Sequence, residues 1–75
     1  MDNKIDIERE IERIDKDLDD AEAAGIQQII LDFFSGAENE REFIFAARAA
    51  AKKRGYDAVH SYEDGELVLI IRKVA

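Results

Sequence analysis

The residues best suited to chemistry in this 75-residue sequence lie in one alternating run near its C-terminal end. His60 is the only histidine, and histidine is the side chain that titrates near neutral pH. Tyr56 and Tyr62 flank it at even spacing, so the three side chains would share one face of a strand and could stack nucleotide bases. We favour the alternative that this face belongs to the core, with a partly buried histidine near the sheet edge, because the following strand pairs apolar residues with it.

The other chemistry-bearing residue types are too few or too scattered to form a recognisable site. The sequence has no cysteine, which excludes disulfides, thiolate metal sites and thiol nucleophiles, and one histidine cannot build a histidine-rich metal centre. Ser35 has no histidine in a recognisable motif, so we interpret it as a helix cap. Asp19 and Asp20 are adjacent and point apart on a helix. We therefore predict no enzyme, no metal site and no cofactor.

Charge narrows the classes of partner. The formal net charge is −7, and residues 1–25 alone carry ten acids against four bases. An acidic surface repels phosphate backbones and anionic lipids, so we expect neither nucleic acid nor membrane as a partner. No apolar run approaches about 18 residues and the first residues are acidic, which argues against a membrane span and a signal peptide. We interpret the acidic segment as a solvated helix face, with a docking surface for a basic partner as the alternative.

Hydrophobic spacing predicts that the acidic segment is a helix. Apolar residues recur there every three or four positions: Ile7, Ile11, Ile14, Leu18 and Ala21. Asp2, Asn3 and Asp6 are alternative N-terminal caps, and Gly25 suits the left-handed position that closes a helix. Three acids lie near the negative end of the helix dipole, where anions are disfavoured, and the sequence gives no structural reason for this placement. A Lys or Arg from elsewhere could offset them. These acids are Asp19, Asp20 and Glu22.

Alternation in residues 26–34 predicts a strand, and a second helix follows that ends near Arg54. Ser35 and Glu38 have the spacing of a capping box, in which each side chain satisfies a free amide at a helix start. Acids precede bases along this helix, in agreement with its dipole. The predicted core residues are Ile29, Leu31 and Phe33 in the strand and Phe43, Ile44, Ala47, Ala50 and Ala51 in the helix.

Residues 56–74 predict a β-hairpin. The Asp-Gly pair at residues 64–65, between two apolar runs, favours a two-residue type I′ turn, which fixes the register. Asp57 should then lie opposite Arg72 and form a cross-strand ion pair, which marks their face as the solvated one. The other predicted pairs are Tyr62 with Leu67, His60 with Leu69, Ala58 with Ile71, Ser61 with Val68 and Val59 with Ile70.

Together these elements predict a single α+β domain over residues 1–75, in the order α-β-α-β-β. The first two strands would run parallel through a right-handed crossover. The third is an unbroken apolar run over residues 67–71, as expected of a central strand. We predict a two-layer sandwich: a three-stranded mixed sheet in the order 1-3-2, with both helices on one face.

Two parts of the chain resemble known families. Leu18-Asp19-Asp20-Ala21 with Ala24-Gly25-Ile26 resembles the helix-to-strand passage of Smr-domain nucleases. Lys53-Arg54-Gly55-Tyr56, with Asp64-Gly65 and Ile71-Arg72-Lys73, resembles the C-terminal half of SirA-like sulfur carriers. Both families have the initiation-factor-three C-terminal-like fold, β-α-β-α-β-β, so the resemblance raises the alternative that residues 4–7 are the vestige of a first strand. The Cys-Pro pair of one family and the His-Gly-Lys-Gly turn of the other are missing, so no site residue carries over.

The sheet face away from the helices carries an apolar group that is a candidate interface. Its members are Ile30, Val59, Val68 and Ile70. Charged residues at positions 57, 63, 66 and 72 surround them, as at many interfaces. An uncovered β-branched patch predicts homodimerisation through sheet faces. Alternatively, Val and Ile stand there only as good strand formers.

The regularity of the sequence resembles that of a computationally designed protein. Loops are minimal, glycines fall only at turns or helix ends, and Pro, Cys and Trp are absent. The absence of Thr and the acids that end the first helix depart from design practice. We predict a designed scaffold that has no evolved activity and requires no partner. The alternatives are a small protein-interaction module that uses the open sheet face and a degenerate Smr-like nucleic-acid-binding module.

Overall fold

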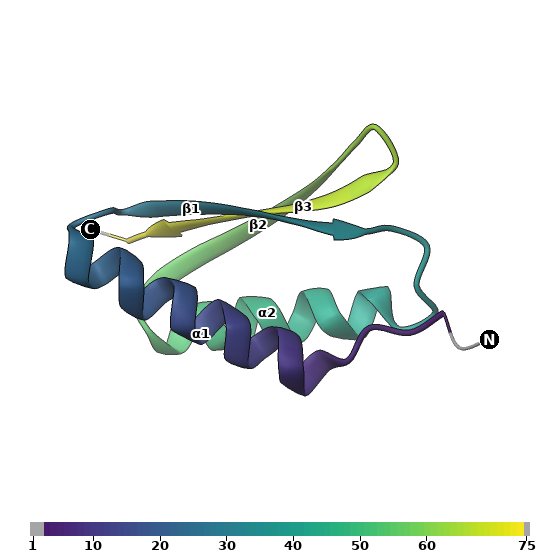
Figure 1. The fold of residues 1–75 in the computed structure, drawn as a ribbon, viewed down its shortest axis with the longest axis horizontal. Coiled ribbons are helices and arrows are strands. Elements are labelled where there is room, and N and C mark those ends of the chain that lie inside the picture. The colour runs from purple at the N-terminus through teal and green to yellow at the C-terminus, as the bar shows by residue number, and fades with distance from the viewer. Residues whose placement is uncertain (1–2, 75) are drawn as a thin grey trace.

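The computed structural model describes residues 3–74, in which two helices lie against one three-stranded sheet (Figure 1). The elements are α1 (Ile7–Ala24), β1 (Gln28–Phe34), α2 (Glu40–Lys53), β2 (Tyr56–Glu63) and β3 (Glu66–Lys73). Their order is the predicted α-β-α-β-β. Asp2, one of the three predicted caps, lies outside the described residues.

The sheet has the predicted strand order, β1-β3-β2, and both helices cover the same face (Figure 1). β3 runs antiparallel to both neighbours, so every hydrogen-bonded pair is antiparallel and the pairing is not mixed as expected. β1 and β2 are parallel to each other, as predicted, but the central strand separates them. The structure is therefore an α+β two-layer sandwich with one uncovered sheet face.

The β2–β3 turn confirms the predicted hairpin. Asp64 and Gly65 both have positive φ, 51° and 77°, as a type I′ turn requires. Every predicted cross-strand pair is present. Asp57 lies opposite Arg72 as predicted, but the two side chains, both within the described residues, form no ion pair, and Nε of Arg72 donates to Oε1 of Gln28 at 3.0 Å instead. Gln28 is the register partner of Arg72 in β1, so the neighbouring strand supplies a better-placed acceptor.

The core lies between the sheet and the helices, and β3 is its most buried strand. Ile14 and Leu18, two residues of the predicted apolar stripe of α1, are fully buried. Phe43 of α2 packs edge to face against Phe33 of β1, with ring centroids 4.8 Å apart. Burying side chains of this size contributes roughly 1.5–3 kcal/mol each to stability. The fully buried large side chains are Ile14, Leu18, Phe43, Leu67, Leu69 and Ile71.

The helix ends agree with the sequence for α1 and differ for α2. Asp6 caps α1 by accepting a hydrogen bond from the Arg9 amide, and Gly25 closes it in the left-handed conformation. The capping box predicted at Ser35 and Glu38 is wrong, because α2 begins at Glu40. The Ser35 hydroxyl donates to the carbonyl of Gly65 at 2.5 Å, so it ties the loop to the hairpin turn instead.

The segment before α1 is held by Asn39, the residue that precedes α2. Its side-chain oxygen accepts from the backbone N–H of Ile5, and its side-chain nitrogen donates to the backbone oxygen of Ile5, both at 2.8 Å. The Ile5 side chain is buried in the core. Residues 3–6 form no strand, so the vestigial strand proposed for residues 4–7 is not present there.

Candidate functional site

The open sheet face, the side of the sheet that the helices leave uncovered, brings the predicted interface residues together. Ile30, Ile70 and Val59 are register partners, one from each strand, so they form an apolar row across the whole sheet. Ile30 is 58% exposed and Val59 is 52% exposed, whereas Ile70, between them, is partly buried. The row is therefore available to a partner along its full width.

Val68 and Phe34 differ from the expectation for this face. Val68 is only 5% exposed, because it lies in the central strand between its register partners Asp32 and Ser61. It supports the face but offers little surface to a partner. Phe34 was missed, although even spacing from Ile30 places it on the same face, and it is 52% exposed. The alternation that identified Ile30 could have found it.

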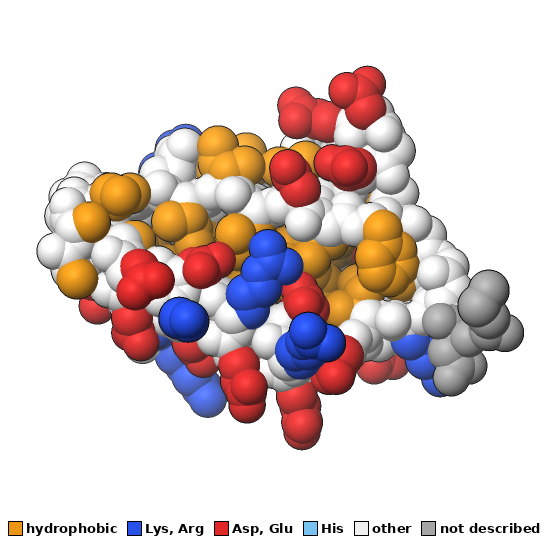
Figure 2. All heavy atoms as spheres, viewed as in Figure 1, with side chains coloured by type: hydrophobic (Ala, Val, Ile, Leu, Met, Phe, Trp, Pro, Cys, Tyr) orange, Lys and Arg blue, Asp and Glu red, His pale blue; other side chains and the backbone are white. Residues whose placement is uncertain are grey.

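The charges of the open sheet face are mostly negative. Its solvated residues include four carboxylates and one guanidinium: Asp32, Asp57, Glu63, Glu66 and Arg72. Figure 2 shows acidic side chains gathered at the tip of the hairpin. The face therefore combines an apolar row with an acidic border.

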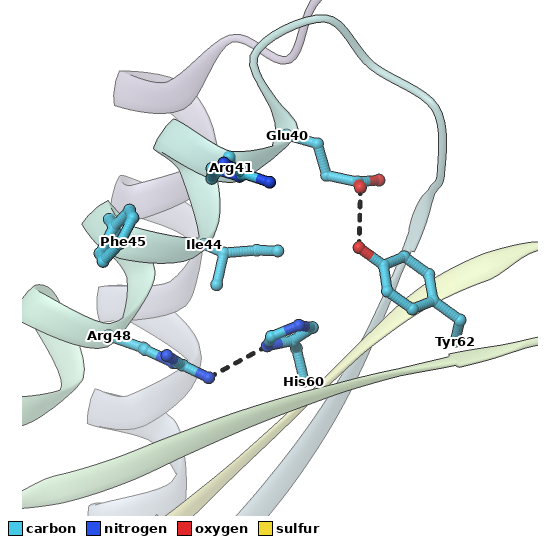
Figure 3. A pocket seen from close by; sticks show the side chains of 7 residues that line it. All are labelled: Glu40, Arg41, Ile44, Phe45, Arg48, His60 and Tyr62. Atoms are coloured by element: carbon cyan, nitrogen blue, oxygen red, sulfur yellow. Dashed lines mark hydrogen bonds between the residues drawn. The ribbon is translucent and has the colours of Figure 1, made fainter.

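A second candidate site is a pocket of about 440 Å³ between α2 and the hairpin (Figure 3). Its lining residues come from α2 and β2, and the hairpin that β2 forms with β3 leans away from the helices towards its tip (Figure 1). Its floor includes Ile44, and its polar walls come from both elements. The polar lining residues are Glu40, Arg41, Arg48, His60 and Tyr62.

The predicted core position of Tyr62 and the predicted partial burial of His60 are wrong, since both side chains are exposed. They lie on the face of β2 that points towards α2, as alternation predicts, but the pocket separates this part of the edge strand from the helix. Nη2 of Arg48 lies 3.0 Å from Nδ1 of His60, and the Tyr62 hydroxyl donates to Glu40 at 2.8 Å (Figure 3). The guanidinium can only donate, so Nδ1 accepts this hydrogen bond.

The geometry of these rings does not form the stacking platform considered above. The rings of His60 and Tyr62 meet edge to face, at 85° and 5.9 Å between centroids. Tyr56, the third member of the alternating run, is only 2% exposed. The hydrogen bond to Glu40 raises the pKa of Tyr62, desolvation and the Glu40 charge raise it further, and Arg41 opposes them. Tyr62 therefore keeps its proton as a donor to Glu40.

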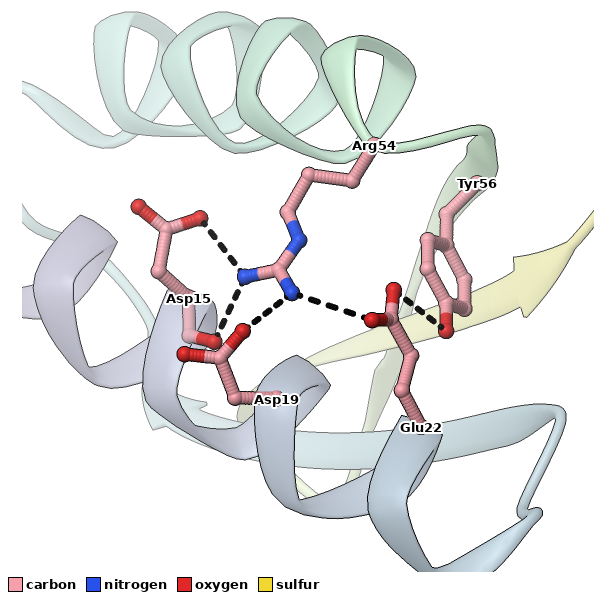
Figure 4. A network of polar contacts seen from close by, with 5 residues as sticks. All are labelled: Asp15, Asp19, Glu22, Arg54 and Tyr56. Atoms are coloured by element: carbon pink, nitrogen blue, oxygen red, sulfur yellow. Dashed lines mark hydrogen bonds and ion pairs between the residues drawn. The ribbon is translucent and has the colours of Figure 1, made fainter.

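Arg54 supplies the basic partner that the end of α1 requires (Figure 4). Its guanidinium pairs with Asp15 at 3.6 Å, with Glu22 at 3.5 Å and, most closely, with Asp19. It also donates to the backbone oxygen of Asp15 at 2.8 Å. The hydrogen bond to Asp19 is the main cause that raises the pKa of Arg54. This cluster joins α1 to the end of α2 and has the character of a structural tie.

Over residues 3–74, no group of three or more His, Asp or Glu side chains is arranged to hold a metal ion. Within the same range, neither helix combines the length and the apolar character needed to cross a membrane.

No family model matches the chain, and no curated protein or solved structure matches it.

Proposed function

We propose that this chain is a designed folded scaffold with no evolved catalytic activity. The observation that carries the proposal is the agreement between local residue choice and the fold. The two-residue turn at Asp64 and Gly65 has the residues that its backbone demands, and it sets the register of the whole hairpin. Among the described residues, every buried side-chain nitrogen and oxygen has a hydrogen-bond partner, which supports the same proposal.

Thermal unfolding followed by circular dichroism tests this proposal. Idealised backbones with consistent local signals are typically hyperstable, so we expect a Tm above about 90 °C. A Tm of about 45–65 °C, the usual range of natural mesophilic domains, would contradict the designed scaffold.

A second candidate function is protein interaction through the open sheet face. The exposed apolar row of Ile30, Ile70 and Val59 favours it, since a scaffold that binds nothing has no use for such a row on its surface. The simplest form is a homodimer through sheet faces. Sedimentation at micromolar concentration tests that form: a dimer that Ile70→Lys dissociates would support it, and a mass of 8.5 kDa would exclude it.

The degenerate nucleic-acid-binding module gains no supporting observation. The four carboxylates of the open sheet face would repel a phosphate backbone. In an anisotropy titration with single-stranded and duplex oligonucleotides we expect no binding, and binding that weakens with salt would reverse this conclusion.

A further inference from the structure

We propose that the open sheet face binds a cationic amphipathic helix of a partner protein, which would add a third layer to the fold. This inference rests on the interaction function proposed above and names the chemistry of the partner. It follows from the dimensions of the face, its apolar row and its charge.

The dimensions of the face fit a single helix. Three strands about 4.8 Å apart and seven or eight residues long cover about 14 Å by about 24–27 Å, a flat area of roughly 350–400 Å². A stable protein interface buries about 800 Å² on each partner, so any partner held by this face alone, a helix or a second copy, would bind weakly. One helix of about 18 residues is about 27 Å long and about 10 Å wide, which matches the face.

The apolar row gives such a helix its anchor. Ile30, Ile70 and Val59 cross all three strands in register, so apolar side chains spaced three and four residues apart on a helix can pack across them. Phe34, further along β1, extends the apolar surface towards the hairpin end. A helix laid along the strands would therefore cross the apolar row once, near Ile70, and could meet Phe34 at the hairpin end.

The charge of the face decides which helix fits. Asp32, Glu63 and Glu66 all lie on the hairpin side of the apolar row. A second copy of this face would bring the same carboxylates, and like charges across an interface oppose association. Lysines and arginines that flank an apolar stripe would meet these carboxylates instead. The partner therefore carries basic residues beside its apolar face, concentrated towards the hairpin end.

A labelled synthetic 18-residue peptide with leucines on one helical face and lysines on the other provides the test, by fluorescence anisotropy. We expect a Kd of about 1–10 μM, as for a small interface. The neutral double variant Ile30→Ser/Val59→Ser should weaken binding at least tenfold. Both residues are more than half exposed, so the fold should tolerate the change, and circular dichroism checks that it does.

Charge variants and control peptides separate the proposed site from general attraction to an acidic protein. Glu63→Gln/Glu66→Gln should weaken binding about tenfold. Glu8→Gln/Glu12→Gln, which removes two exposed carboxylates from α1, should leave the Kd within twofold. A peptide in which serines replace the leucines should not bind. Equal binding of that peptide, or equal loss with both charge variants, would overturn the proposal.

Sedimentation of the wild-type chain separates failure of this inference from failure of the interaction function. A dimer that Ile30→Ser/Val59→Ser dissociates would show that a second copy occupies the face, which overturns the helix proposal but keeps the interaction function. A monomer that binds the peptide supports both. A monomer that does not bind it overturns the helix proposal and removes the support for interaction through this face.

Discussion

Tyr56 and Tyr62 stand on the same strand and on the same face of the sheet, yet one is buried and the other is exposed. Each hydroxyl donates to a glutamate of a helix, Tyr56 to Glu22 at 3.4 Å and Tyr62 to Glu40 at 2.8 Å. Tyr56 is buried beside the end of α1, whereas Tyr62 faces the start of α2 across a pocket, towards the tip of the hairpin (Figure 3). Alternation along a strand therefore decides which face a residue occupies, but burial also depends on the packing around it: Leu67, the register partner of Tyr62 in the central strand, is fully buried.

The two ends of the molecule differ accordingly. At the closed end, which holds Tyr56, the Arg54 cluster ties α1 to the end of α2 (Figure 4). At the open end, which holds Tyr62, the helix and the hairpin are joined by exposed polar contacts around a pocket. We therefore expect substitutions at the closed end to lower the free energy of unfolding more than matched substitutions at the open end.

The largest effect should come from the tyrosines themselves. Tyr56→Ala removes a buried ring, so we expect a loss of about 3–5 kcal/mol in the free energy of unfolding. Tyr62→Ala removes a half-exposed ring and one exposed hydrogen bond, and should cost about 1 kcal/mol or less. Urea unfolding measures both values. Losses of similar size at the two positions would break the comparison.

Arg54→Met tests the tie at the closed end. Methionine keeps much of the apolar stem but removes the donors to three carboxylates and one backbone oxygen, so we expect a loss of about 1–2 kcal/mol. Arg48→Met at the open end removes one exposed contact, with His60, and should change stability by about 0.5 kcal/mol or less. Denaturant titration of both variants provides the measurement. An equal or larger loss for Arg48→Met would refute the assignment of the tie to Arg54.

Asn39→Ala tests whether the open end has a tie of its own within the helix layer. The change removes two part-buried hydrogen bonds to Ile5, and we expect a loss of about 1 kcal/mol with faster hydrogen exchange at the Ile5 amide. Asn3→Ala, which removes an exposed hydrogen bond to the Gly36 carbonyl, is the matched control and should have a smaller effect. Unchanged exchange at Ile5 would show that the side chain of Ile5, and not Asn39, holds this segment.

The smallest effect should be a loss of stability at alkaline pH. The folded state raises the pKa of both tyrosines above the ordinary value near 10, mainly through burial at Tyr56 and through the hydrogen bond to Glu40 at Tyr62. A raised folded pKa contributes stability that is fully present below about pH 10 and is lost as pH rises through the folded value. Tyr62→Phe should reduce this alkaline loss, as measured by urea midpoints at about pH 9 and about pH 11. An unchanged pH dependence in Tyr62→Phe would show that Tyr62 does not contribute to it.

Local signals were sufficient for much of the fold. The Asp-Gly pair at residues 64–65 gave the register because its turn geometry is set by two residues alone. Gly25 marked the end of α1 because the left-handed conformation that closes a helix depends on that one residue. The acids at the end of α1 indicated a basic partner, although the dipole argument could not say that Arg54 would be the residue.

Contacts between distant segments set the limit of prediction. Ser35 matched a capping box, but the Gly65 carbonyl is its partner in the folded chain, 30 residues away. The tie between Asn39 and Ile5 has no local signature, because an amide side chain can pair with any backbone. On the open sheet face, the pattern placed Ile30 and Val68 together, but burial of Val68 depends on neighbours in two other strands.

The central place of β3 has a consequence for the order in which the molecule comes apart. β1 and β2 never touch, so each is held in the sheet only by the strand between them. The hairpin closes through a two-residue loop, whereas the connection from β1 to β3 contains α2 and β2, and the entropy of closing that long connection favours the release of β1. We therefore expect β1 to dissociate from the sheet first, while β2 and β3 stay paired. Amide protons in hydrogen bonds between β1 and β3 should then exchange with solvent before those in hydrogen bonds between β2 and β3.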